Sequence, residues 1–296
     1  MSYRPHLSYV APARGAPELW RTLAGVVLTV VAGIALYQAG FALVSNLVGL
    51  ETTDAILEAT DSDNATAFAA LYSLFTFGFF AVGLALAVNA LHGRHSATLF
   101  GPWEAVVSDF LRVLLTVGGL LLLLWVVLPQ DYETVRNTAM PRGTWVLLLP
   151  VSIAAILVQA GTEELFFRGY LQQQLAARFP TLPLWLIVPS LAFGLLHLAP
   201  GAAGSNAPLY ALWATCFGLA AADLTARTGA IGAAIGFHAA NNIASILLVS
   251  VAGPGSGLAL WHIPIRLDDP AIAALMLPEV LTTFCCWLAA RLALKV

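Results

Sequence analysis

The chain has 296 residues, of which 59% are hydrophobic and only 10% are charged, and its mean hydropathy is +0.84. This composition excludes a water-soluble domain and predicts an integral membrane protein. The formal net charge is only -3. Because no basic tract interleaved with aromatic residues is present, nucleic acid is excluded as a partner, and the lipid bilayer is the expected surrounding.

Apolar runs of about 20 residues with few charges indicate helices that cross a bilayer. Eight such runs predict an all-α, polytopic membrane protein with about eight transmembrane helices. The fifth run is short for a full crossing, and the eighth contains Pro278 and Glu279. The predicted spans are residues 22–44, 66–91, 110–129, 144–162 (continuing as a polar helix to 178), 184–199, 208–226, 230–252 and 271–294.

These spans divide the chain into four predicted parts. A cytoplasmic N-terminal segment (1–21) precedes the N-terminal transmembrane helices (22–143). The fourth to seventh spans form a transmembrane core (144–252), which carries the candidate catalytic residues, and an outer loop with the C-terminal helix follows (253–296). Lys and Arg gather on one side of the spans, which predicts that both termini are cytoplasmic. The predominance of Arg over Lys, with abundant Ala, is typical of a GC-rich bacterial genome and favours a bacterial cytoplasmic membrane.

Several polar or reactive residues are expected to be structural. The three cysteines, Cys216, Cys285 and Cys286, lie in apolar runs and are predicted to be core residues, neither disulfide-bonded nor metal ligands. Asp223 and Arg227 are four residues apart, which predicts a structural salt bridge. No role is assigned to Glu279.

Three ionisable residues lie together near the end of the fourth span, and each costs roughly 2.5–3.5 kcal/mol to place at bilayer depth. At about 100° per helical residue, Glu164 and Arg168 lie about 40° apart, whereas Glu163 lies about 140° from Arg168. Arg168 can therefore neutralise Glu164, which leaves Glu163 free to face a polar pocket. The alternative is a charge cluster at the point where the helix leaves the lipid.

Two other spans carry polar side chains at the same four-residue spacing. Phe193 precedes His197, so the aromatic ring and the imidazole share a helix face, where the ring can wall a pocket. His238 and Asn242 are likewise one turn apart. Taken alone, His197 could be a buried core histidine, and His238 and Asn242 could make polar contacts between helices.

Together these spans carry a carboxylate, two imidazoles and a carboxamide, which are the groups needed to hydrolyse an amide. Glu163 would act as general base, with His197 orienting the water or passing a proton to the leaving amine. His238 and Asn242 would donate hydrogen bonds to the developing oxyanion. Alternatively, Glu163, His197 and His238 are the ligand types of a zinc site with one open position. The sequence leaves both chemistries open.

The motifs Glu163-Glu164-x-x-x-Arg168, Phe193-x-x-x-His197 and His238-x-x-x-Asn242 occur in this order on consecutive hydrophobic segments. This set resembles the motifs of the CPBP family, also called Abi, which comprises CAAX proteases and bacteriocin-processing enzymes and includes the type II CAAX prenyl endopeptidases. The resemblance covers roughly residues 145–250. It implies a water-activating Glu163 supported by Glu164 and Arg168, a second catalytic group at His197, and oxyanion or substrate-orienting roles for His238 and Asn242. Phe193 is the predicted substrate contact.

The resemblance implies an intramembrane endopeptidase that cleaves a membrane-associated peptide or protein, of CAAX-like or bacteriocin type. Family members are labelled metalloproteases, but a glutamate mechanism is also proposed for them, and we expect that mechanism, for which zinc is not required. One alternative is a non-catalytic membrane-binding or bacteriocin-immunity protein of the same fold. Another is a small proton-coupled carrier, although no inverted repeat is visible in the sequence.

Overall fold

The computed structural model describes residues 3–61, 66–128, 132–253 and 255–296. Pro254 of the predicted outer loop and the first two residues of the predicted N-terminal segment lie outside the described residues. Helices dominate, which confirms the predicted all-α class. The α-helices are α1 (Arg4–Val10), α2 (Leu19–Val48), α3 (Leu50–Asp61), α4 (Ala67–His92), α5 (Trp103–Val127), α6 (Arg142–Glu164), α7 (Gln173–Arg178), α8 (Leu182–Leu196), α9 (Pro200–Ala203), α10 (Ala207–Thr228), α11 (Gly232–Asn242) and α12 (Ile272–Leu294).

Shorter elements of other kinds connect these helices. Two π-helical segments, η3 and η5, continue α6 and α11 without a break. Four 3-10 turns and three short strands complete the described chain. The segments are η1 (Ala11–Gly15), η2 (Ser96–Leu99), η3 (Leu165–Gln172), η4 (Gly204–Asn206), η5 (Ile243–Leu248), η6 (Ser256–Leu258), β1 (Val135–Arg136), β2 (Val249–Val251) and β3 (Trp261–Ile263).

Among the described residues, six helices are long and apolar enough to cross a membrane. Two shorter apolar helices, Pro183–Leu196 and Gly232–Leu248, correspond to the fifth and seventh predicted spans. The polytopic membrane architecture is therefore confirmed, while the number of crossings stays a prediction. Leucines such as Leu147 and Leu292 are 79% and 78% exposed on the outside of the bundle. Such outward-facing apolar side chains are what contact with lipid requires.

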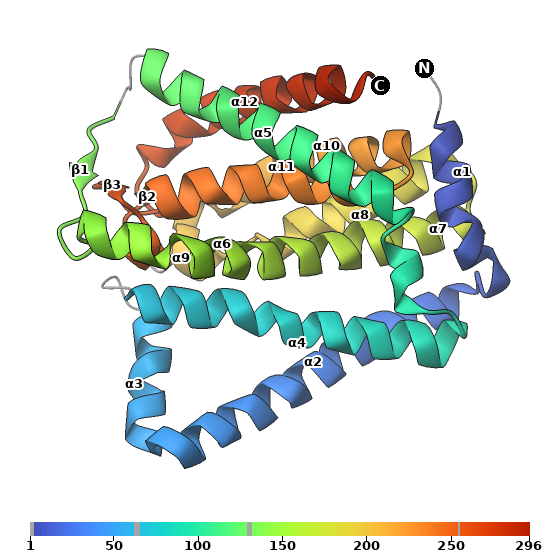
Figure 1. The fold of residues 1–296 in the computed structure, drawn as a ribbon, viewed down its shortest axis with the longest axis horizontal. Helices are drawn as coiled ribbons and strands as arrows, with labels where there is room; N and C mark the ends of the chain where they lie inside the picture. Colours follow the sequence, from blue (N-terminus) through green and yellow to red (C-terminus); the bar gives the residue numbers. More distant parts are fainter. Residues whose placement is uncertain (1–2, 62–65, 129–131, 254) are drawn as a thin grey trace.

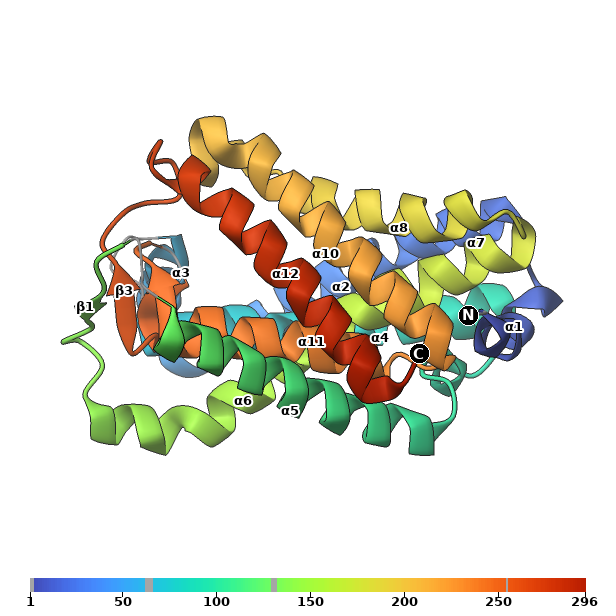
Figure 2. The same ribbon diagram turned by 90° about the horizontal axis from the view of Figure 1, so that it is seen from above.

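The helices surround α11, which is short but almost wholly buried. It packs against α5, α6 and α10, and α12 crosses α5 and α10 on one side of the molecule (Figures 1 and 2). On the opposite side α4 packs against α6, and α2, α3 and α4 form a triangle (Figure 1). The fourth predicted span is thus placed beside the seventh, although their helices are about 70 residues apart in the chain.

Two glycines let α11 approach α5 closely. A Cβ atom on Gly236 would lie 2.6 Å from the carbonyl oxygen of Phe110, and one on Gly232 would overlap the backbone of Val106. Glycines four residues apart lie on one helix face and allow backbones to pack together in membranes. This contact fixes the position of the residues that follow Gly236 on α11.

The two ends of the bundle differ. Helix α1 and the C-terminal end of α12 lie at one end, and the three strands lie at the other with α3 (Figure 1). The strands form a small sheet in the order β1-β3-β2, antiparallel between β1 and β3 and parallel between β2 and β3. The side chain of Arg136 donates to the carbonyl oxygen of Leu260 at 2.6 Å, which ties β1 to the loop before β3.

The predicted salt bridge between Asp223 and Arg227 is confirmed. Nε of Arg227 lies 2.8 Å from Oδ2 of Asp223. The Tyr3 hydroxyl and the Trp287 indole also donate to this carboxylate, at 2.6 and 2.9 Å. Asp223 therefore joins α10 to the N-terminal segment and to α12, away from the candidate active site.

The cysteine prediction is wrong for one of the three residues. Cys286 is buried and Cys216 is partly buried, but Cys285 is exposed. Neighbouring residues on a helix point about 100° apart, so only one of the adjacent pair can face the bundle. All three thiols are free.

Candidate active site

The predicted pair of Glu164 and Arg168 is present and wholly buried. Nη1 of Arg168 lies 3.1 Å from Oε1 of Glu164, and both side chains are 0% exposed. Nη2 of Arg168 donates to the carbonyl oxygen of Gly218 on α10 at 3.0 Å. The guanidinium also lies 4.9 Å from the ring of Phe193 on α8. Arg168 therefore links α6, α8 and α10 around the buried carboxylate.

His238 lies between the two glutamates. Its Nδ1 atom is 2.8 Å from Oε1 of Glu164, and its Nε2 atom is 3.7 Å from Oε2 of Glu163. A histidine whose Nδ1 donates to a carboxylate has a fixed ring orientation. Glu164 thus directs Nε2 of His238 toward Glu163.

The two glutamates have different surroundings. The side chain of Glu163 is 15% exposed, whereas that of Glu164 is 0% exposed and holds both Arg168 and His238. Each carboxylate has a buried Oε2 atom to which no other group in the described part of the chain makes a hydrogen bond. Buried acceptors are normally paired, so each of these oxygens keeps an unused capacity to accept a hydrogen bond. Glu163 is the more accessible of the two.

A second contact joins α6 to α11, one helical turn from the contact between Glu163 and His238. Nδ2 of Asn242 donates to Oε1 of Gln159 at 2.8 Å. Gln159 precedes Glu163 by four residues, just as His238 precedes Asn242, so the two contacts lie side by side between antiparallel helices. Sequence reasoning missed Gln159. Its spacing from Glu163 was the available signal.

His197 is placed at the edge of this group. It follows the last residue of α8, and its Nδ1 atom lies 2.8 Å from the carbonyl oxygen of Phe193. Its ring centroid lies 4.5 Å from that of Phe193, whose ring is in turn 5.9 Å from that of His238. The shared face predicted for Phe193 and His197 is present, and the aromatic ring lies between the two imidazoles. Phe193 itself is 2% exposed, so its predicted contact with substrate stays a prediction.

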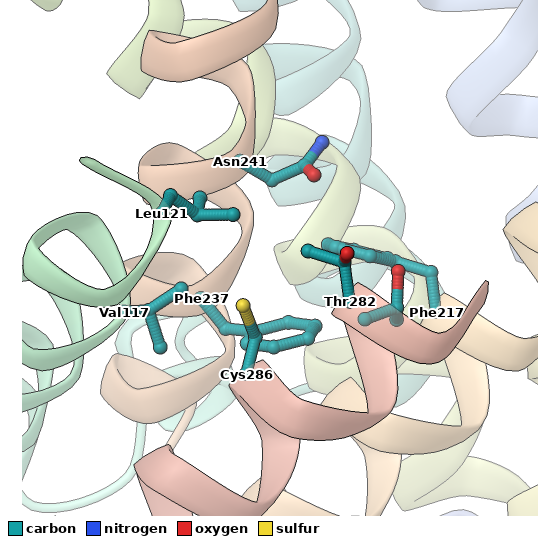
Figure 3. Close-up of a pocket in the computed structure, with 8 residues that line it drawn as sticks. Val117, Leu121, Phe217, Phe237, Asn241, Thr282 and Cys286 are labelled. Atoms are coloured by element: carbon teal, nitrogen blue, oxygen red, sulfur yellow. The ribbon is translucent and has the colours of Figure 1, made fainter. Parts of the chain in front are cut away.

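A small pocket lies on another side of α11, between α5, α10 and α12. Figure 3 shows Asn241 from α11 facing side chains of α5 and α12. The pocket is lined by Val117, Leu121, Phe217, Phe237, Asn241, Thr282, Thr283 and Cys286. Phe217 separates this pocket from the glutamates, because its ring packs against both Phe237 and His238 at 4.7 and 5.2 Å.

The alternative of a zinc site stays a prediction. Among the described residues, no three His, Cys, Asp or Glu side chains are grouped so that they could hold a metal ion. Of the three candidate ligands, Glu163 and His238 are neighbours, and His197 and His238 each contact the ring of Phe193. A three-ligand metal site would need all three side chains to converge on one point.

The comparisons with known proteins agree with the motifs. Residues 145–244 match the family described as type II CAAX prenyl endopeptidase Rce1-like. This match confirms the resemblance to the CPBP family of CAAX proteases, and it spans α6 to α11, which carry the site. The chain is also 29% identical over 249 residues to "Uncharacterized protein YyaK" of Bacillus subtilis (strain 168), covering 80% of each chain. No solved structure matches significantly.

Proposed function

We propose that the chain is an intramembrane endopeptidase that hydrolyses a peptide bond with water activated by Glu163. The observation that carries the proposal is the position of His238, with one ring nitrogen against Glu164 and the other toward Glu163. The similarity of residues 145–244 to a family of CAAX-type intramembrane proteases supports this class of reaction.

Glu163 is the proposed general base. Its partly exposed carboxylate takes a proton from a bound water molecule while the water oxygen attacks the carbonyl carbon of the scissile bond. The C–N bond of the tetrahedral intermediate then breaks, and the proton held by Glu163 passes to the leaving amine, directly or through His197. The products are a new carboxylate and a new amine, and Glu163 returns to its ionised state.

His238 and Asn242 are the proposed donors to the oxyanion of the tetrahedral intermediate. Because Nδ1 of His238 donates to Glu164, Nε2 can donate only when the ring carries both protons. Glu164 and Arg168 act as supporting residues that orient the imidazole. Preorganised donors of this kind are usually a large part of catalysis in acyl transfer.

The proposed substrate is a membrane-associated peptide or protein, of CAAX-like or bacteriocin type. The proposed location is a bacterial cytoplasmic membrane with both termini inside. In support, α1 and the C-terminal end of α12 lie at the same end of the bundle (Figure 1). Lys and Arg residues gather in the segments at that end, as the positive-inside rule expects. Reporter fusions to the C-terminus and to the β1 loop test this orientation, and equal accessibility of the two would contradict it.

A quenched fluorescent peptide library, with prenylated and unprenylated members, tests the function. Purified wild type and Glu163→Ala are compared in detergent, with and without a chelator. Cleavage that is lost in the variant and kept with chelator supports the proposal. Cleavage that is lost with chelator and restored by added zinc would support a zinc mechanism in place of the metal-free one. Equal cleavage by wild type and Glu163→Ala would overturn the role of Glu163. Protection against a bacteriocin that survives loss of both Glu163 and His238 would instead support an immunity protein.

A further inference from the structure

A chain of three side-chain amides lies beside the glutamates. Nδ2 of Asn241 lies 3.3 Å from Oδ1 of Asn242, and Nδ2 of Asn242 lies 2.8 Å from Oε1 of Gln159. Both ends of the Asn242 amide are therefore held, the oxygen by a donor and the nitrogen by an acceptor. Turning the amide over would place donor against donor and acceptor against acceptor.

The amide of Asn242 keeps one free donor in this arrangement. An Asn side chain has two N–H groups on Nδ2, and the bond to Gln159 uses one of them. The second N–H is not used by that bond, and Asn242 shares a helix face with His238. Gln159, which is 8% exposed, thus determines which way the free donor of Asn242 faces.

Gln159 also couples this donor to the proposed base. Gln159 and Glu163 lie one turn apart on α6, opposite Asn242 and His238 on α11. The contact of Gln159 with Asn242 and the contact of Glu163 with His238 therefore form two adjacent links between the same pair of helices. A shift of α11 along α6 would break both links together.

We infer that Gln159 is a positioning residue that orients the Asn242 amide toward the oxyanion of the tetrahedral intermediate, which forms beside Glu163. This inference rests on the proposed function, because it concerns the same reaction. It differs from a merely structural contact between helices in one respect. Loss of a structural contact would change stability alone. Loss of a positioning residue lowers kcat, and it does so only while Asn242 is present.

The test is a double-mutant cycle with Gln159→Met, Asn242→Ala and the double variant, measured on a peptide that wild type cleaves. Gln159→Met keeps the length of the side chain and removes the acceptor. We expect kcat to fall about 10- to 100-fold with KM nearly unchanged, less than the loss on removing an oxyanion donor itself. The double variant is expected to be no slower than Asn242→Ala. If the kcat losses of the two single variants multiply in the double variant, the inference is overturned. A raised KM with unchanged kcat in Gln159→Met would overturn it as well.

Gln173→Met is the matched control. Gln173 is also a buried glutamine, but it bonds to Arg94 and Thr98 at the end of the bundle near α1. Its loss is expected to lower the thermal stability while leaving kcat near that of wild type. If Gln173→Met lowers kcat as much as Gln159→Met, the effect is one of general stability and the inference fails.

A second readout separates failure of this inference from failure of the proposed function. If Glu163→Ala cleaves as well as wild type, the proposed function fails, and the cycle is then read from the unfolding temperatures of the same four proteins in detergent. If the change in unfolding temperature of the double variant differs from the sum of the two single changes, Gln159 would still be the residue that holds Asn242. Additive unfolding temperatures would show that the two amides are not coupled and would overturn the inference whatever the activity.

Discussion

The imidazole of His238 is hydrogen-bonded to the buried carboxylate of Glu164, with 2.8 Å between Nδ1 and Oε1. The same carboxylate oxygen lies 3.1 Å from Nη1 of Arg168. A residue of α6 thereby fixes a ring on α11, and the two helices that carry the candidate site are held in one register. Changes to this link, or to the packing around it, should therefore alter both stability and activity.

Removing the charge of Glu164 is expected to destabilise the fold strongly. Glu164→Gln leaves the wholly buried Arg168 without its counter-ion, and breaking one partner of a buried pair costs about 3–5 kcal/mol. The unfolding temperature in detergent should fall well below that of wild type. Glu104→Gln, at an exposed position in the first turn of α5, is the control and should leave it unchanged.

The double variant Glu164→Leu with Arg168→Met sharpens this prediction. Replacing a buried ion pair by apolar residues is often neutral or stabilising, because no uncompensated charge remains. We expect the double variant to unfold at a higher temperature than Glu164→Gln. An equal or lower temperature would mean that packing around Arg168, and not its charge, determines the effect.

A side chain at Gly236 is expected to disturb both stability and activity. In Gly236→Val the new Cβ would press on the carbonyl oxygen of Phe110, and overpacking of this kind costs typically about 1–3 kcal/mol. Because α11 must move away from α5, His238 would move with it, and cleavage should fall by more than the loss of folded protein explains. Gly119→Ala on α5 is the control, since a Cβ there meets no atom within 4 Å. Full activity of Gly236→Val would contradict the close-packing account.

The stability of the fold is expected to fall in mild acid because of His6. This residue of α1 is buried against Trp185, with 4.3 Å between ring centroids, and burial lowers its pKa to about 4. The unfolded chain therefore takes up the proton first. The contribution of His6 is complete above about pH 6.5 and is lost, by about 1–3 kcal/mol, as the pH falls toward 4.

The replacement His6→Gln tests this pH dependence. Its unfolding temperature should depend less on pH between about 7 and 5 than that of wild type, because Gln does not titrate. The exposed His95→Gln is the control and should keep the wild-type slope. If His6→Gln keeps that slope as well, His6 is not the group that senses acid.

Sequence reasoning found the parts of the site that depend on a single helix. The i,i+4 spacing predicted the pair of Glu164 and Arg168, and the order of the three motifs predicted which helices carry polar groups. The bridge formed by His238 depends on how α11 lies beside α6, which is a tertiary relationship that helical spacing does not encode. Gln159 was missed because a single amide in an apolar helix belongs to none of the three motifs.

The local geometry after the site residues was also beyond prediction. The chain changes from α- to π-helix directly after Glu164 and again directly after Asn242. A π-helix has a wider turn than an α-helix and is frequent at functional sites, but no residue type marks where it begins. The helical wheel used for the fourth span assumed α-geometry throughout, and the α/π change is invisible to such a projection.

The most direct test of the central claim is the cleavage rate of Glu163→Gln on the best library peptide, compared with wild type and with the exposed Glu104→Gln. The new side-chain amide keeps the size of the glutamate side chain but cannot accept a proton from water. If Glu163 is the general base, Glu163→Gln should be slower by about 100- to 10,000-fold, with its unfolding temperature near that of wild type and Glu104→Gln unaffected. Cleavage by Glu163→Gln at the wild-type rate would contradict the account.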